Sequence, residues 1–132
     1  MTRVLAPAVP EPPREHMFSN ARVHGGHFFL SGMHAGSPEG VVGGDDAYLQ
    51  AQEVFRRLGA LAEACGGRLD DLITLRVYLT DMADKAAVGR ARAEAFSGDF
   101  PCSTLVEVSA LVDEGLRVEI EAQGILGSAT SG

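Results

Sequence analysis

The sequence contains few cysteines and a single lysine, and each shortage excludes a class of protein. Among its 132 residues only Cys65 and Cys102 are cysteines. Two are too few for the disulfide framework of a small secreted domain, and neither lies in a CxxC motif. Lys85 is the one lysine, so Schiff-base chemistry would depend on a single side chain of a type that is usually solvated. We therefore expect a protein of the reducing cytoplasm.

Basic runs and long apolar runs are also missing. The chain has 18 acidic and 11 basic residues and a formal charge of −7, whereas nucleic acids and anionic membranes are bound by clustered lysine and arginine. No apolar stretch approaches the ~18 residues that span a membrane, and the first residues show no apolar signal-peptide core. We expect neither a nucleic-acid partner nor a membrane.

The four histidines do not form a recognisable metal motif. No HxH or HExxH spacing occurs anywhere in the chain, although such spacings bring histidines together on one strand or one helix turn. The sequence therefore predicts no metal, and it contains no motif for another cofactor.

The chain is organised as one domain with two short extensions. Residues 1–15 hold four of the six prolines, which favours an extended arm. The tail at 127–132 is small and polar and is expected to be flexible. Between them, residues 16–126 are long enough for a single domain with its own core.

Alternating and helical patterns predict the elements of this domain. A hairpin is expected at 22–33, with its turn at Gly25-Gly26. The following elements are predicted, in order, as a helix after Asp45 or Asp46 that ends at Gly66, a strand at 70–80, a helix at 81–97, and strands at 103–108 and 116–124.

This ββαβαββ order predicts an α+β fold with two helices on one face of a mixed sheet. The other face would carry Arg76, Tyr78, Glu119 and Glu121. Such a half-polar face is either solvated or covered by another subunit, and tyrosine and arginine are favoured at interfaces. We therefore expect an oligomer.

Four segments of the chain read FLSG at 29–32, LDDLITLRVYLTDM at 69–82, VEVSAL at 106–111 and VEIEA at 118–122. In sequence, order and spacing they resemble the motifs of the RidA family, also called YjgF or endoribonuclease L-PSP. The resemblance covers about residues 16–126. It implies a chorismate-mutase-like fold and a homotrimer whose three sheets pack into a central barrel, with a small-molecule cleft at each subunit interface.

The resemblance also implies an activity, but not all of its residues are present. The best-understood members hydrolyse imines and enamines of amino acids to 2-keto acids and ammonia, and an arginine in the pattern P-A-R-S-x-V-E-V clamps the substrate carboxylate. Here Ser103 occupies the arginine position. Leu105 stands in place of a common cysteine, Gly89 in place of an asparagine and Phe18 in place of a tyrosine, whereas the retained cleft residues are Ser31, Gly32 and Glu119.

These departures place the chain in a branch of the family without the usual arginine. Serine cannot form the two charge-assisted bonds that a guanidinium makes with a carboxylate. The substrate is then expected to be neutral or cationic at this end and not a 2-imino acid, unless Arg76 or Arg90 replaces the missing cation.

Glu119 is the predicted acid/base residue of the cleft. Among apolar neighbours such as Leu105 and Phe18, its carboxyl group would hold a proton more readily and could transfer it. The alternative is a structural bond to water or to Arg76. His34 follows FLSG and is a further candidate at the cleft mouth, although a lone histidine is more often an ordinary loop residue.

Three functions remain open on this basis. The first is an enzyme that hydrolyses an imine or enamine, or transfers a proton on a related unsaturated metabolite. The second is a non-catalytic trimer that binds a small molecule or a partner. A ribonuclease is third, and the acidic charge disfavours it.

Overall fold

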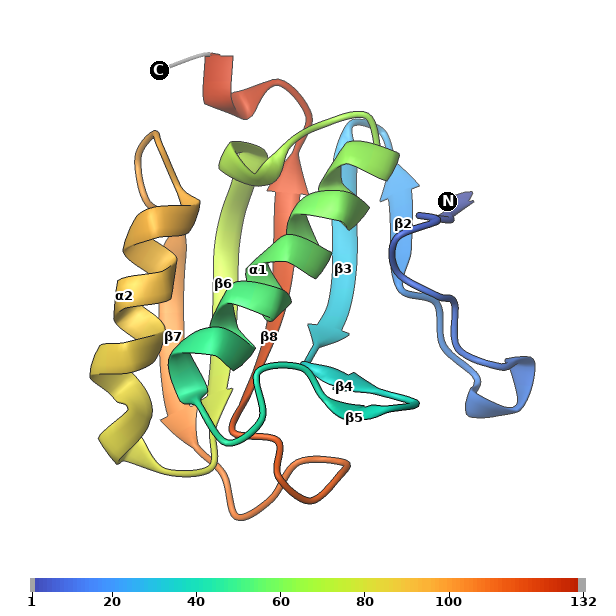
Figure 1. Ribbon diagram of the computed structural model, residues 1–132. Coiled ribbons are helices and arrows are strands. Elements are labelled where there is room, and N and C mark those ends of the chain that lie inside the picture. Colours follow the sequence, from blue (N-terminus) through green and yellow to red (C-terminus); the bar gives the residue numbers. More distant parts are fainter. Residues whose placement is uncertain (1, 131–132) are drawn as a thin grey trace.

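The computed structural model describes residues 2–130, which form a mixed sheet with two helices packed on one face (Figure 1). This confirms the predicted α+β class and the ββαβαββ order of the domain. The main elements are β1 (Thr2–Val4), β2 (Ala21–His24), β3 (His27–Met33), β4 (Gly36–Ser37), β5 (Gly40–Val41), α1 (Ala47–Ala64), β6 (Leu72–Leu79), α2 (Lys85–Ala95), β7 (Cys102–Glu107) and β8 (Val118–Ile125).

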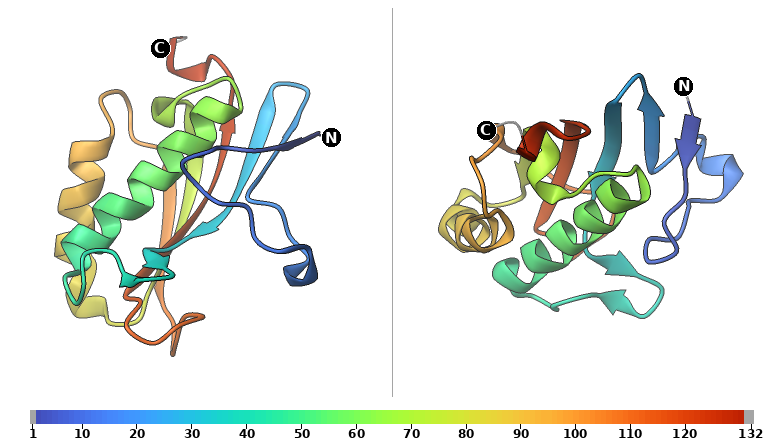
Figure 2. Two further views of the ribbon diagram at one scale, coloured as in Figure 1. Left: turned by 45° about the vertical axis from the view of Figure 1, so that its right-hand side comes forward. Right: turned by 90° about the horizontal axis from the view of Figure 1, so that it is seen from above.

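The six-stranded sheet has the order β1-β2-β3-β8-β6-β7. Its neighbours are antiparallel except for β6 and β7, which run parallel. A parallel pair needs a crossover connection, and α2 supplies it. The two helices lie together on one side of the sheet, and the opposite side is open (Figure 2).

The N-terminal cap and the apolar face of α1 explain why this helix forms here. The Asp46 carboxylate accepts a hydrogen bond from the Leu49 N–H at 3.1 Å and so caps α1. Val54 and Leu58 face the sheet and are fully buried. Gly66 then ends the helix with φ +97°, a conformation that favours glycine. The predicted start and end are therefore both confirmed.

The N-terminal segment is more structured than an extended arm. Thr2–Val4 pairs with β2 as an edge strand, and both Ala6 and Val9 are buried. The strand can form because it precedes the first proline, Pro7, so its backbone N–H groups remain available for the ladder. The segment between Pro10 and Asn20 stands out from the sheet in Figure 2.

The described part of the C-terminal tail is held against the domain by hydrogen bonds to Asp71. The Asp71 carboxylate accepts a hydrogen bond from the Ala129 N–H at 2.8 Å, and the Asp71 carbonyl accepts one from the Ser128 hydroxyl at 3.0 Å. Residues 131–132 lie outside the described part of the chain. Within the described residues, no helix is long and apolar enough to cross a membrane.

Candidate functional site

The open face of the sheet carries a shallow pocket beside the Glu119 carboxylate. The pocket encloses about 270 Å³. Its lining comes from β3, β6, β8 and the segment after β7, and consists of Gly32, Tyr78, Val108, Ala110, Leu111, Glu119 and Glu121. The predicted polar face is therefore confirmed, since Tyr78 lies opposite Glu119 and Arg76 lies opposite Glu121 in the β6–β8 register.

Two carboxylates lie on this face, and of these two only Glu121 forms an ion pair within residues 2–130, whereas Glu119 forms none. The Tyr78 hydroxyl donates a hydrogen bond to Glu121, and this bond raises the pKa of Tyr78. An Arg76 Nη atom lies 4.0 Å from the same Glu121 carboxylate. Arg76 thus forms its ion pair with Glu121 and not with Glu119, and the phenol stays protonated at neutral pH.

Gly32 makes the space that the Glu119 side chain occupies. A Cβ atom added at residue 32 would lie 3.0 Å from Glu119 Cδ and 3.1 Å from Cγ, and closer still to one carboxylate oxygen. Real Cβ atoms avoid such contacts, so any larger residue at 32 would displace the carboxylate. The structure therefore brings these two predicted residues together.

One of the two apolar neighbours predicted for Glu119, Leu105, is wrong. Leu105 lies opposite the buried Val77 in the β6–β7 register and packs against the core, so it is on the helix side of the sheet. Alternation along a strand puts it on the opposite face from Glu119. Val108 and Leu111 are the apolar residues that line the pocket instead.

Ser31 holds the segment that carries Phe18. The Ser31 hydroxyl donates to the Ser19 carbonyl at 2.6 Å, and its N–H donates to the Asn20 carbonyl at 2.8 Å. Phe18 directly precedes this anchor and is 52% exposed. An exposed aromatic side chain held by a fixed backbone is available to a ligand or to a second subunit.

The other predicted residues gather at a separate place, where α2 meets β7. Ser103 lies opposite the buried Leu75 in register, which puts it on the helix side of β7. Gly89 belongs to the overlying helix α2, and a Cβ atom there would meet nothing within 4 Å. The named cleft residues thus form two groups on opposite faces of one chain.

Sequence reasoning missed the cation in this second group. An Arg92 Nη atom donates to the Ser103 hydroxyl at 3.1 Å. The spacing Gly89–Arg92 places both residues on one helix face, and this signal could have identified Arg92. Arg90, the candidate named instead, lies with its guanidinium carbon 4.1 Å from the centre of the Tyr48 ring.

His34 and Cys102 lie elsewhere. The His34 Nδ1 accepts a hydrogen bond from the Gly36 N–H at 3.0 Å, and its carbonyl accepts one from Arg57 at 2.5 Å. These contacts stabilise the turn after β3. Cys102 is exposed in the chain and lies on β7, an edge strand.

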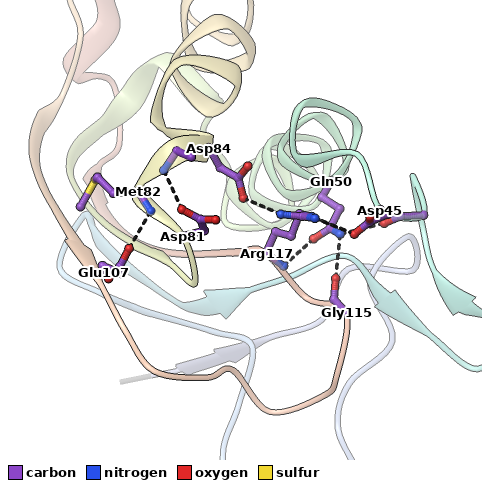
Figure 3. Close-up of polar contacts among 10 residues, drawn as sticks. Asp45, Gln50, Asp81, Met82, Asp84, Glu107, Gly115 and Arg117 are labelled. Atoms are coloured by element: carbon purple, nitrogen blue, oxygen red, sulfur yellow. Dashed lines mark hydrogen bonds and ion pairs between the residues drawn. The ribbon is translucent and has the colours of Figure 1, made fainter.

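A larger pocket of about 580 Å³ lies next to the first one, at the start of β8, shares Ala110 and Leu111 with it, and was not predicted. One wall is Arg117, whose guanidinium is 2.8 Å from Asp45 and 3.1 Å from Asp84 (Figure 3). Asp81, also in the lining, caps the turn that precedes α2 by accepting from the Ala83 N–H at 2.9 Å. Because these charged side chains bind one another and the nearby backbone, we interpret their contacts as stabilising the loops around the pocket.

Metal ligands do not cluster in the described part of the chain. No group of three or more histidine, cysteine, aspartate or glutamate residues there could hold a metal ion.

Comparisons with known proteins agree with this architecture. A solved protein of unknown function from Pseudomonas aeruginosa is 43% identical and superposes with a TM-score of 0.85, covering 96% of this chain and 92% of that chain. A RutC family protein of Pyrococcus horikoshii is 36% identical over 106 residues, 80% of this chain and 83% of its own length. A 2-iminobutanoate/2-iminopropanoate deaminase of Dermatophagoides farinae is 29% identical over 122 residues, 90% of this chain and 91% of its own.

A family model is matched over nearly the whole domain. It is described as endoribonuclease L-PSP and matches residues 9–125. This range contains both groups of candidate residues and all four motifs that carried the resemblance. The chain therefore belongs to the endoribonuclease L-PSP family, also known as the YjgF or RidA family.

Proposed function

We propose that this protein is a homotrimer with small-molecule clefts between its subunits, which hydrolyse an imine or enamine. The observation that carries the proposal is the division of the candidate residues into two groups. Glu119 and Gly32 lie on the open face, whereas Ser103 and Gly89 lie on the helix side at the β7 edge. One chain cannot bring these groups around one ligand, but the open face of one subunit can meet the β7 edge of the next.

Glu119 acts in the proposed reaction as acid and base. Its carboxylate takes a proton from the water that attacks the imine carbon and delivers it to the nitrogen, which gives a carbinolamine. Transfer of the remaining hydroxyl proton to the nitrogen then breaks the C–N bond, so that ammonia leaves and a carbonyl remains. The neighbouring carboxylate of Glu121 is held by Tyr78 and Arg76, so Glu119 is the one available for this transfer. The relative from Dermatophagoides farinae, which is named as an imine deaminase, supports this reaction class.

Glu119→Gln tests the proposal most directly. We expect the variant to keep the fold, because glutamine is nearly isosteric, and to lose about 10²-fold or more of the turnover of a panel of imines generated in the assay. Glu39→Gln is the matched control, since Glu39 is an exposed residue of the β4–β5 turn. An unchanged rate in Glu119→Gln would leave Glu119 with a structural role.

A non-catalytic binding trimer is the second candidate. It is favoured by Leu105, which packs against the core at a position where the resemblance implies a cysteine, and by Phe18, which lacks a hydroxyl. In that case the wild-type trimer would bind small carbonyl compounds without turning over any imine of the panel.

A further inference from the structure

Tyr78 lines the pocket beside Glu119, and the proposed reaction gives its hydroxyl no direct part. The two residues are directly opposite one another in the β6–β8 register, and these strands lie side by side in the middle of the sheet (Figure 1). Opposite residues of an antiparallel pair have Cβ atoms about 5 Å apart on the same face. The phenol and the Glu119 carboxylate therefore border the same space.

The single hydrogen of the Tyr78 hydroxyl is directed at Glu121 and not into the pocket. The hydroxyl donates this hydrogen to the Glu121 carboxylate, and Arg76 lies 4.0 Å from the same carboxylate. A tyrosine hydroxyl that donates its one hydrogen keeps its oxygen as an acceptor, and donation to a carboxylate makes that oxygen more negative. Tyr78 thus offers a ligand an acceptor and no donor.

The other side chains that line the pocket add acceptors and apolar surface but no donor. The ionised carboxylates of Glu119 and Glu121 accept hydrogen bonds only. Val108, Ala110 and Leu111 contribute apolar side chains. A ligand group with N–H hydrogens therefore finds acceptors here. A carbonyl or carboxylate oxygen would instead face other oxygens and lack a side-chain donor, which costs free energy.

We propose that Tyr78 binds the nitrogen end of the substrate and that the substrate is an imine whose nitrogen carries a hydrogen. This inference rests on the proposed function and names the substrate class of that site. The nitrogen of such an imine has one hydrogen and one lone pair in the plane of its double bond. The hydrogen is donated to the Tyr78 oxygen, which leaves the lone pair for the proton that Glu119 delivers. The carbonyl product has no N–H group, so it loses this hydrogen bond and is released.

Three ligands that do not react test the inference on the intact protein. Butanamidinium, butanamide and butanoate share one planar shape, and their head groups carry two nitrogens, one nitrogen and none. By NMR titration we expect the wild type to bind butanamidinium about tenfold or more tightly than butanoate, with butanamide between them. Tyr78→Phe should lose about fivefold or more of the affinity for butanamidinium. Tyr48→Phe is the matched control and should bind as the wild type does, because Tyr48 also donates to a glutamate, Glu94, but belongs to α1.

A second background removes the effect of a freed carboxylate. In Tyr78→Phe the Glu121 carboxylate loses its donor and becomes open to a cation itself. Glu121→Gln removes this charge, while its side-chain oxygen still accepts the Tyr78 hydrogen. Adding Tyr78→Phe to Glu121→Gln should therefore lower the affinity for butanamidinium by about fivefold or more. This comparison carries the test if the freed charge masks the loss in the single variant.

The outcomes for Tyr78 and for the enzyme are distinguishable. Undiminished butanamidinium binding on Tyr78→Phe in both backgrounds, or equal binding of butanamidinium and butanoate by the wild type, would overturn the inference and leave the proposed hydrolysis intact. Binding of butanamidinium through Tyr78 by a protein that turns over no imine would support the inference and would instead contradict the proposed hydrolysis.

Discussion

At the scale of single residues, Gln50 joins three segments that are far apart in the sequence. Its side chain is fully buried and donates from Nε2 to the carbonyls of Gly44 and Gly115, at 2.8 and 2.9 Å. Its Oε1 accepts from the Arg117 N–H at 2.8 Å (Figure 3). One amide thus joins the loop before α1 to the segment before β8, so the positions of these two loops depend on it.

Gln50→Leu should destabilise the protein by about 3 kcal/mol. Leucine leaves one N–H and two carbonyls without partners, and because Gly44 and Gly115 are exposed residues we expect about 1 kcal/mol for each group, the low end of the roughly 1–3 kcal/mol for a buried one. The urea midpoint measured at a fixed protein concentration checks this. Gln52→Leu, on the exposed side of α1, should change the free energy of unfolding by no more than about 0.5 kcal/mol, and equal losses in the two variants would contradict the role of Gln50.

Arg92 shows at the same scale why a motif alone misleads about charge. The sequence places serine where the resemblance implies arginine, which indicates a site without a cation. The helix turn above Ser103 places another arginine within 3.1 Å of its hydroxyl. The positive charge beside Ser103 therefore comes from a neighbouring element, which the motif by itself does not reveal.

At the scale of the elements, Glu53 links the outer surface of α1 to the end of β3. It accepts hydrogen bonds from Arg56 and Arg57, both at 2.7 Å, and Arg57 also donates to the His34 carbonyl. The bonds from Arg56, with those from Arg57, hold the pKa of Glu53 below its ordinary value of 4.5. An ion pair between Glu53 and Arg57 and a hydrogen bond from Arg57 to the His34 carbonyl thus connect α1 to the turn after β3.

The contribution of Glu53 should depend on pH. Because its pKa is lower in the folded than in the unfolded chain, its stabilisation is present above pH 4.5 and is lost as the pH falls through the lower folded value. Wild type should therefore exceed Glu53→Gln in urea midpoint at about pH 7, and the difference should shrink by about pH 3. Glu63→Gln, an exposed position on the same helix, is the control, and a difference that does not vary with pH would contradict the ion-pair explanation.

At the scale of the whole molecule, the open face of the sheet remains uncovered in one chain. Val106 lies opposite Tyr78 in register and is 41% exposed, and Ile125 at the end of the same face is 39% exposed. A sheet with helices on one side and half-apolar side chains on the other favours burial against a further layer. A second and a third copy of the chain would supply that layer in the proposed trimer.

Light scattering should report a particle of about three times the 13.9 kDa chain mass. Val106→Glu should shift the population toward the monomer, because it puts a charge into the proposed interface. Leu49→Glu is a matched substitution on the helix side, where Leu49 is 43% exposed, and it should leave the mass unchanged. A wild-type monomer at micromolar concentration would contradict both the trimer and the cleft between subunits.

Most of the fold could be predicted from local patterns. The alternation in β6 and the helical spacing of Val54, Leu58 and Leu61 report which side of each element is buried, since strand and helix periods differ. Glu119 and Gly32 were predicted from the resemblance, and the structure brings them together. The edge strand Thr2–Val4 was not predicted, because three residues carry no period and their pairing depends on β2.

The sequence by itself determined the order of the elements, the polar face of the sheet and the family, because these depend on periodicity and on motifs that are continuous in the chain. Only the tertiary structure decided that Arg92 reaches Ser103, that Leu105 faces away from Glu119, and that the candidate residues form two separate groups. These facts depend on which strands are neighbours and on how α2 crosses from β6 to β7. Contacts between elements are fixed by packing and crossover geometry, which no local pattern encodes.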